Sequence, residues 1–103
     1  MANFGLVVEF TIDMAQEERF LSLISENARK SVQNEKGCQQ FDVLSSTEQR
    51  GQIILYEIYD DEDAFKEHLK MQHVADFFAA AKPLILTQVV RRFRRDRGNL
   101  KGT

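Results

Sequence analysis

The chain of 103 residues has one cysteine, one proline and no tryptophan. A single cysteine, Cys38, excludes an internal disulfide and a cysteine-rich metal site, which fits a reducing compartment. The N-terminal residues carry no basic charge and Glu9 interrupts their apolar run, so we expect neither a signal peptide nor a membrane span. Glycine-rich phosphate loops, nucleophile elbows and cysteine–histidine pairs are also missing, which argues against nucleotide binding and covalent catalysis. These absences predict a cytoplasmic protein that acts without a membrane.

Charge is unevenly distributed along this sequence. The net charge is −2, but six of the 14 basic residues fall within residues 91–103. A basic stripe can mark a nucleic-acid surface, yet no groove-reading motif accompanies this one. We therefore expect one domain over residues 1–93, followed by a basic C-terminal tail over residues 94–103, and no nucleic-acid partner.

Alternating and helical hydrophobic patterns predict six elements. Strands are expected at 4–12, 39–46, 52–59 and 84–93, and helices at 13–37 and 61–82. This βαββαβ order is typical of a ferredoxin-like α+β sandwich, in which both helices cover one face of a four-stranded antiparallel sheet.

The first helix has a start signal, an exit signal and a buried face. Asp13 with Gln16 three residues later resembles a capping box, and Gly37 is typical of a helix exit. The side chains expected to face the core are Phe20, Leu21, Ile24, Ala28 and Val32. Asn27 lies at the edge of this face, where an unpaired amide is costly, so we expect a protein partner or a ligand to bind it.

Residues 54–78 join a strand, an acid-capped helix and both histidines of the chain. The four acids at 60–63 suit the first turn of a helix, because its free N–H groups and positive dipole end favour negative charge. The apolar stripe then shifts near residues 70–72, which predicts a kink. His68 and His73 are expected on inward or half-inward faces. Five residues apart on one helix, they would stand about 140° apart, so we expect no metal site.

Both faces of the predicted sheet are apolar. In the third strand, Leu55 and Tyr59 face one way, whereas Ile54 and Ile58 face the other. Two helices cover only one face, and monomers rarely expose an apolar patch as large as the other. We therefore expect a homodimer that packs through the open sheet face.

The chain resembles a known family in three segments: residues 33–44, the strand and acidic turn at 56–64, and the two histidines with the residues between them. These segments are similar to the antibiotic-biosynthesis-monooxygenase domains of the dimeric α/β-barrel superfamily, and most similar to the branch that holds quinol monooxygenases and the phospho-autoinducer-2-processing isomerase. The resemblance implies a homodimer, a ligand pocket between sheet and helices, and chemistry without flavin, metal or haem. Haem-degrading members press a tryptophan onto the porphyrin, and this chain has none.

The resemblance also implies roles for individual residues. His73 matches the second histidine of the family's His-Leu-x-x-x-His element, Asn27 matches an asparagine of the first helix, and Tyr56 matches an aromatic residue of the third strand. These three are the predicted catalytic residues, and an imidazole pKa near about 6.5 suits proton transfer at neutral pH. The predicted substrate-binding residues, each of which is also suited to packing, are His68, Phe65, Phe77 and Phe41.

Three functions stay open at this point. In a cofactor-independent monooxygenase, His73 would take a proton from a small aromatic or quinol-type substrate held by Asn27 and Tyr56, and the anion would react directly with oxygen. In an isomerase of a small phosphorylated hydroxy-carbonyl compound, such as phospho-autoinducer-2, the same base would move a proton next to a carbonyl. The third is a non-catalytic dimer that binds a small ligand, because a fold alone does not define a reaction.

Overall fold

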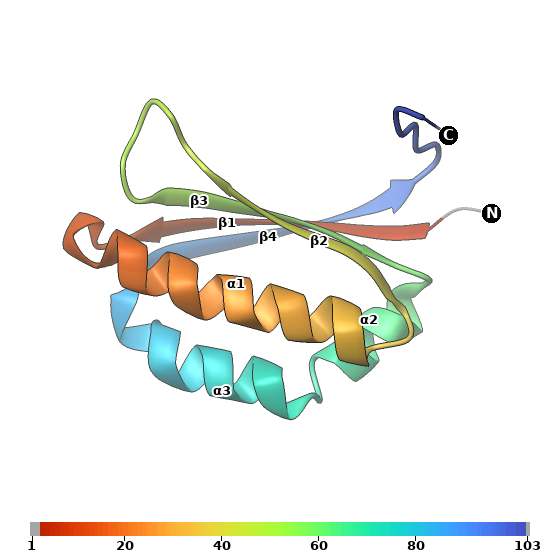
Figure 1. The fold of residues 1–103 in the computed structure, drawn as a ribbon, viewed down its shortest axis with the longest axis horizontal. Coiled ribbons are helices and arrows are strands. Elements are labelled where there is room, and N and C mark those ends of the chain that lie inside the picture. Colours follow the sequence, from red (N-terminus) through yellow and green to blue (C-terminus); the bar gives the residue numbers. More distant parts are fainter. Residues whose placement is uncertain (1–2, 103) are drawn as a thin grey trace.

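The computed structural model describes residues 3–102, which form a four-stranded sheet with helices on one of its faces (Figure 1). The strands are β1 (Asn3–Ile12), β2 (Cys38–Ser45), β3 (Gln52–Tyr59) and β4 (Ile85–Arg95). The helices are α1 (Glu17–Asn34), α2 (Glu62–His68) and α3 (Gln72–Ala81), with short 3-10 turns η1 (Met14–Gln16) and η2 (Lys82–Leu84). The predicted ferredoxin-like α+β fold is confirmed.

Neighbouring strands of the sheet are all antiparallel, in the order β2-β3-β1-β4. Side chains alternate along each strand, so one set faces the helices and the other faces away. On β3, Leu55 and Glu57 face the helices, opposite Val8 and Leu6 of β1. The most deeply buried residues of the core, each no more than 1% exposed, include Phe10, Ile12, Phe20, Ile24, Ile53 and Tyr59.

One position on the predicted buried face of α1 is wrong. The residues that α1 buries are Phe20, Ile24, Asn27, Ala28 and Ser31. Val32 is 44% exposed, and Ser31 takes the inward position instead. This serine is accommodated because its hydroxyl donates a hydrogen bond to the backbone oxygen of Asn27, four residues earlier, at 2.8 Å. Intrahelical bonding of this kind satisfies a hydroxyl without a partner outside the helix.

The structure explains the glycine at position 37 differently from the prediction. A glycine that ends a helix usually adopts a positive φ, but Gly37 does not, whereas Gly51 in the β2–β3 turn has a φ of 84°. A Cβ placed on Gly37 would lie 2.6 Å from the Cβ of Ala64, which is far inside van der Waals contact. The absent side chain therefore lets the segment before β2 approach α2.

Acidic side chains cap the helical segments near both predicted starts. Asp61 accepts a hydrogen bond from the backbone N–H of Ala64 at 2.8 Å, as expected for the start of α2. Asp13 accepts from the N–H of Ala15 at 3.0 Å, and this cap begins η1 rather than α1 itself. The predicted irregularity in the second helix is confirmed as a complete break between α2 and α3.

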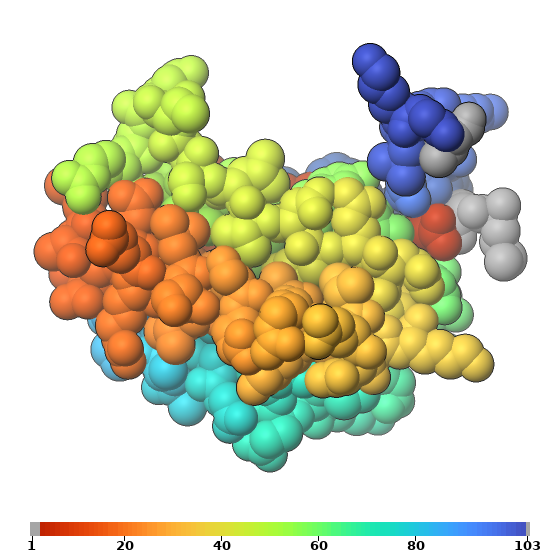
Figure 2. Space-filling model, viewed as in Figure 1, coloured from red at the N-terminus to blue at the C-terminus, as the bar shows by residue number. Residues whose placement is uncertain are grey.

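The second face of the sheet carries no helix in the described part of the chain (Figure 1). Leu44, Val89 and Phe93 on this face are 50%, 41% and 51% exposed. Figure 2 shows that the surface above the sheet is hollowed between the β2–β3 loop and the C-terminal segment. An apolar, concave face is therefore open in the single chain.

The C-terminal strand runs beyond the predicted end of the domain. β4 continues past residue 93 to Arg95, and residues 96–102 follow without a helix or strand. Arg94 forms an ion pair with Asp96 at 2.7 Å, so part of the basic segment is paired within itself. Within residues 3–102, no helix combines the length and the apolar character that crossing a membrane requires.

Candidate active site

A cavity of about 90 Å³ lies between the sheet and the helices. Its walls are mostly apolar and include Leu6, Val8, Phe10, Phe65, Val74 and Phe77. Three polar side chains in the lining are buried, namely Asn27 at 5%, Glu57 at 2% and His68 at 5% exposure. The exposed members of the lining are Leu69, Phe78, Gln88 and Val90. The cavity therefore opens between the α2–α3 segment and β4, with its polar groups inside.

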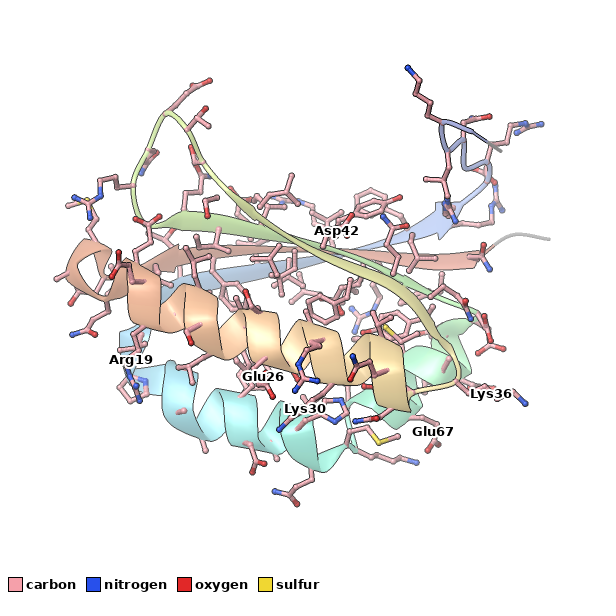
Figure 3. The ribbon with its side chains drawn as sticks, viewed as in Figure 1. Arg19, Glu26, Lys30, Lys36, Asp42 and Glu67 are labelled. Atoms are coloured by element: carbon pink, nitrogen blue, oxygen red, sulfur yellow. The ribbon has the colours of Figure 1, made fainter. Side chains whose placement is uncertain are left out.

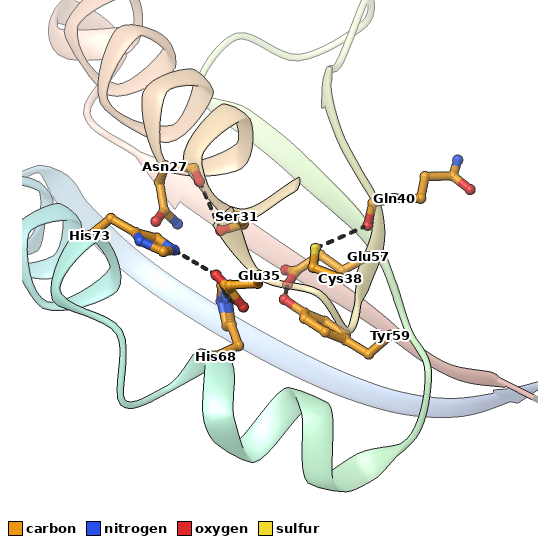
Figure 4. Close-up of polar contacts among 9 residues, drawn as sticks. All are labelled: Asn27, Ser31, Glu35, Cys38, Gln40, Glu57, Tyr59, His68 and His73. Atoms are coloured by element: carbon orange, nitrogen blue, oxygen red, sulfur yellow. Dashed lines mark hydrogen bonds and ion pairs between the residues drawn. The ribbon is translucent and has the colours of Figure 1, made fainter. Parts of the chain in front are cut away.

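Glu35, directly after α1, joins both histidines (Figure 4). Both of its carboxylate oxygens lie 3.0 Å from Nδ1 of His68, and Oε2 lies 2.5 Å from Nε2 of His73. The side chains of Glu35, His68 and His73 are only 5%, 6% and 11% exposed. A carboxylate only accepts hydrogen bonds, so the ring nitrogens that face it carry the hydrogens. A neutral His68 then keeps an unprotonated Nε2.

The break between α2 and α3 makes this cluster possible. The expectation that the two rings point far apart around one helix is wrong, because the helix ends at His68 and restarts at Gln72. The potential ligand atoms of Glu35, His68 and His73 lie within 4.8 Å of one another. Two imidazoles and a carboxylate are a donor set that divalent transition metals accept. In the structure, these atoms are joined by the hydrogen bonds described above.

The environment of His68 suits a neutral base. Burial lowers the pKa of the ring, because apolar surroundings disfavour the charged imidazolium, and the Glu35 carboxylate acts in the opposite direction. Aromatic rings surround it, with centroid distances of 5.2 Å to Tyr59, 6.1 Å to Phe65 and 6.2 Å to Phe41. A ring that is neutral and oriented through Nδ1 can accept a proton at Nε2.

Asn27 has an unsatisfied oxygen. Its Oδ1 is buried and has no hydrogen-bond partner among residues 3–102. An orphaned buried polar atom costs about 1–3 kcal/mol, so it is rarely retained without a reason. Because Asn27 lines the cavity, a hydroxyl or N–H group of a bound ligand would supply the missing donor.

A second polar group lies further along the sheet. The hydroxyl of Tyr59 donates a hydrogen bond to Oε1 of Glu57 at 2.6 Å. Burial raises the pKa of Glu57 to about 7, although this hydrogen bond opposes the shift. Burial likewise raises the pKa of the nearby Cys38 thiol to about 12, which keeps the thiol protonated at neutral pH.

The structure brings some of the predicted site residues together and separates others. Asn27, His68, Phe65 and Phe77 line the cavity. His73 lies outside the cavity, in a shallow groove between α1 and α3 that Glu26 and Lys30 also border. Figure 3 labels these last two residues on α1.

Two more predicted residues lie outside the cavity. Phe41 is buried near His68 but contributes to a different groove, beside α1. Tyr56 pairs with Val7 and Asp42, residues whose side chains lie on the open side of the sheet. It cannot contact the cavity of its own chain, and its predicted catalytic role therefore has no support from this placement.

Sequence reasoning missed Glu35, Glu57 and Tyr59. A signal for Glu57 was present, because it occupies a core-facing position in the β3 alternation and a charged residue there is unusual. Tyr59 lies two residues after Glu57 on β3, so its side chain is on the same face of the sheet. Glu35 gave no such signal, since it follows the helix and belongs to no periodic pattern. Its role depends on where the α2–α3 break places the histidines.

A sheet with helices on one face and a partly polar cavity between the layers defines this chain as a small α+β domain of the ferredoxin-like class. The chain belongs to the antibiotic biosynthesis monooxygenase family, whose profile matches residues 3–80. A comparison with curated proteins gives no match.

Solved structures with the same fold agree with this assignment. A proposed antibiotic biosynthesis monooxygenase from Bacteroides thetaiotaomicron superposes with a TM-score of 0.89 at 20% identity, over 98% of this chain and 96% of that one. Another, from Caulobacter crescentus, superposes with a TM-score of 0.85 at 24% identity, over 89% of this chain and 88% of that one. A conserved protein from Methanosarcina mazei superposes with a TM-score of 0.85 at 16% identity, over 93% of this chain and 95% of that one. At these identities the likeness establishes the fold alone.

Proposed function

We propose that the chain is a cofactor-independent monooxygenase that acts on a small aromatic or quinol-type substrate. One observation carries the proposal: the imidazole of His68 lines a largely apolar cavity while the buried Glu35 carboxylate contacts its Nδ1. This arrangement orients a general base and stabilises the imidazolium that forms when the base takes a proton. Asn27 in the same cavity offers a substrate hydroxyl its Oδ1, which has no partner in the described part of the chain.

The size of the cavity supports a small substrate. A closed apolar cavity of roughly 150 Å³ holds benzene in another protein, so about 90 Å³ encloses only part of one ring. The rest of the substrate would lie in the mouth, against Leu69 and Phe78. In such a site, removal of a phenolic or activated C–H proton yields an electron-rich anion that reacts with oxygen without a bound metal or flavin.

This assignment moves the predicted role of the base from His73 to His68. The predicted base, His73, does not line the cavity and contacts Glu35, which in turn contacts His68. We therefore assign proton abstraction to His68 and assign to His73 the positioning of the shared carboxylate. The carboxylate in turn orients the His68 ring.

The test is oxygen uptake by metal-stripped protein on a panel of hydroquinones, catechols and anthrones. We expect His68→Gln to lower kcat by roughly 10²–10⁴-fold, the range for loss of a general base, and His73→Gln to lower it much less. Lys66→Gln, an exposed change on the same helix, serves as the control. A larger loss in His73→Gln would return the base to His73, and activity that needs an added divalent metal would contradict the cofactor-free proposal.

The isomerase keeps one specific argument in its favour, because the cavity contains a second titratable group, Glu57, besides His68. Proton removal at one carbon and return at another suits two such groups. Absence of oxygen uptake, together with deuterium exchange into hydroxy-ketone phosphates, would favour this reaction. Saturable binding without any turnover would favour a ligand-binding protein.

We also propose that two copies pair through the open sheet face. The support is the exposed apolar surface there, including Leu44, Val89 and Phe93, and the concave shape of that face (Figure 2). Apolar surface of this kind is usually covered by a partner. The pairing would leave both cavities accessible, because they open on the helical side of the sheet.

A further inference from the structure

We propose that Glu57 is a second proton-transfer residue, which protonates the peroxide formed in the cavity and then removes the last substrate proton. The inference rests on the proposed oxygenase function and adds a catalytic carboxyl to it. Glu57 lies in the lining of the same cavity as His68 and Asn27, so a substrate held there would contact all three side chains.

The position of Glu57 in the sheet is unusual for a charged residue. Its cross-strand neighbours on the helix-facing side are Leu6 on β1 and Phe41 on β2, both buried and apolar. The side chain is 2% exposed, and no ion pair to it is found within residues 3–102. The hydrogen bond from Tyr59 fixes Oε1. A buried carboxyl without a counter-ion destabilises a fold, so its presence at a cavity indicates a chemical use.

The groups around Glu57 set its protonation state. Burial favours the neutral acid, the negative charge of Glu35 adds to this effect, and the Tyr59 hydrogen bond favours the carboxylate. The balance places the pKa at about 7, where a carboxyl both donates and accepts protons readily. The titratable and charged groups that face this region from the neighbouring elements are Cys38, Tyr59, Glu35, His68 and, beyond Leu6 on β4, Arg92.

The proposed reaction requires four proton movements. For the anthrones of the test panel, oxidation of the CH₂ carbon to a carbonyl consumes one O₂ and releases one water, so two protons leave carbon and two arrive on oxygen. His68 takes the first proton, and the resulting anion transfers its electron pair to O₂, in two one-electron steps, with formation of a C–O bond. Protonated Glu57 gives its proton to the peroxide anion, which becomes a hydroperoxide.

The second half of the cycle restores both residues. The Glu57 carboxylate removes the remaining C–H proton, and the electron pair of that bond forms the carbonyl while the O–O bond breaks. The departing hydroxide takes the proton held by His68 and leaves as water. Glu57 ends protonated and His68 ends neutral, so two groups on one cavity complete the cycle without exchange with solvent.

The first experiment compares Glu57→Gln and Tyr59→Phe with the wild-type protein. Glu57→Gln keeps the shape of the side chain, and we expect kcat to fall by roughly 10²-fold while KM changes little. Tyr59→Phe removes the donor that favours the carboxylate, so the pKa of Glu57 rises and the alkaline limb of the kcat profile moves to higher pH. A purely structural role for the pair would not move that limb. Full kcat in Glu57→Gln with an unshifted profile in Tyr59→Phe would overturn the inference.

A second readout separates this inference from the proposed oxygenase. The infrared C=O band of a protonated carboxyl is measured in the wild-type protein and in Glu57→Gln, with and without resorcinol as a slowly oxidised phenol. We expect a band near neutral pH that shifts when resorcinol binds and is absent in Glu57→Gln. If the wild-type protein takes up no oxygen but shows this band, the proposed oxygenase function is rejected. The conclusion that Glu57 is protonated in the binding cavity is then retained. A wild-type protein without the band contradicts the inference.

Discussion

At the scale of single residues, the site is built from side chains that weaken the fold locally. Among residues 3–102, the Asn27 oxygen has no hydrogen-bond partner and the Glu57 carboxyl has no counter-ion, and both groups lie inside the core. Groups of this kind lower the free energy of unfolding, and proteins tolerate them where binding or catalysis needs them. The sequence indicated Asn27 through its position on a helix edge, but it could not show that the oxygen has no partner, because that depends on the packing of α1 against α3.

The pH dependence of stability follows from Glu57. Its pKa rises from the ordinary 4.5 to about 7 on folding, so the folded protein holds a proton that the unfolded chain releases between these values. The contribution of this bound proton to the free energy of unfolding is complete below the pKa that Glu57 has in the unfolded chain. It disappears as pH rises through the pKa that Glu57 has in the folded protein. At 1.36 kcal/mol per pKa unit, the change amounts to roughly 3 kcal/mol.

Glu57→Gln stays neutral at every pH and loses this dependence. We expect the free energy of unfolding of the variant, relative to wild type, to increase between about pH 5 and about pH 8 in urea titrations. His68 acts in the opposite direction, since its lowered pKa removes stability as pH falls, but it is present in both proteins and cancels in the comparison. Parallel pH profiles for the two proteins would show that Glu57 titrates normally.

At the scale of elements, hydrophobic patterns predicted the strands and a kink in the second helix, which the structure shows as a break between α2 and α3. They could not predict its effect on the histidines, because a break changes the relative direction of two helices in a way that no periodicity describes. Periodicity also could not predict why residue 37 is a glycine, because the cause is the close approach of α2, a segment far away in the sequence. Val32 and Ser31 show a smaller error, in which an intrahelical hydrogen bond allows a polar residue onto the buried face.

The close approach between Gly37 and α2 predicts that a larger side chain at position 37 lowers the stability of the fold. Gly37→Ala places a Cβ 2.6 Å from that of Ala64, so α2 must move away from the start of β2. We expect a loss of roughly 1–3 kcal/mol, typical of overpacking, measured by urea unfolding. Gly5→Ala is the matched control, because its Cβ would meet no atom closer than 3.6 Å. Equal stability of the two variants would contradict the close packing between these segments.

At the scale of the whole molecule, the apolar pattern on both sides of the sheet predicted a second covered face, and the structure shows that face open and concave. Phe93 lies on this face at 51% exposure and lies outside the cavity lining.

Replacement of Phe93 with glutamate puts a charge in the proposed dimer interface. We expect light scattering after size-exclusion chromatography at micromolar concentration to give a dimer mass for the wild-type protein and a monomer mass for Phe93→Glu, because an unpaired buried charge opposes association. Met14→Glu, at an exposed apolar residue on η1, is the control that should remain dimeric. A monomer mass for the wild-type protein would remove the pairing proposal.

The opening of the cavity lies apart from its polar interior. Leu69, Phe78, Gln88 and Val90 surround the entrance and are exposed, whereas the residues assigned to proton transfer are buried. Substitutions at the entrance therefore change little of the core, and they would alter which molecules enter without altering the acid and base inside. Evolution within such a domain can diversify substrate range through a few surface positions, and a mutant library restricted to those four codons is a practical route to new selectivity.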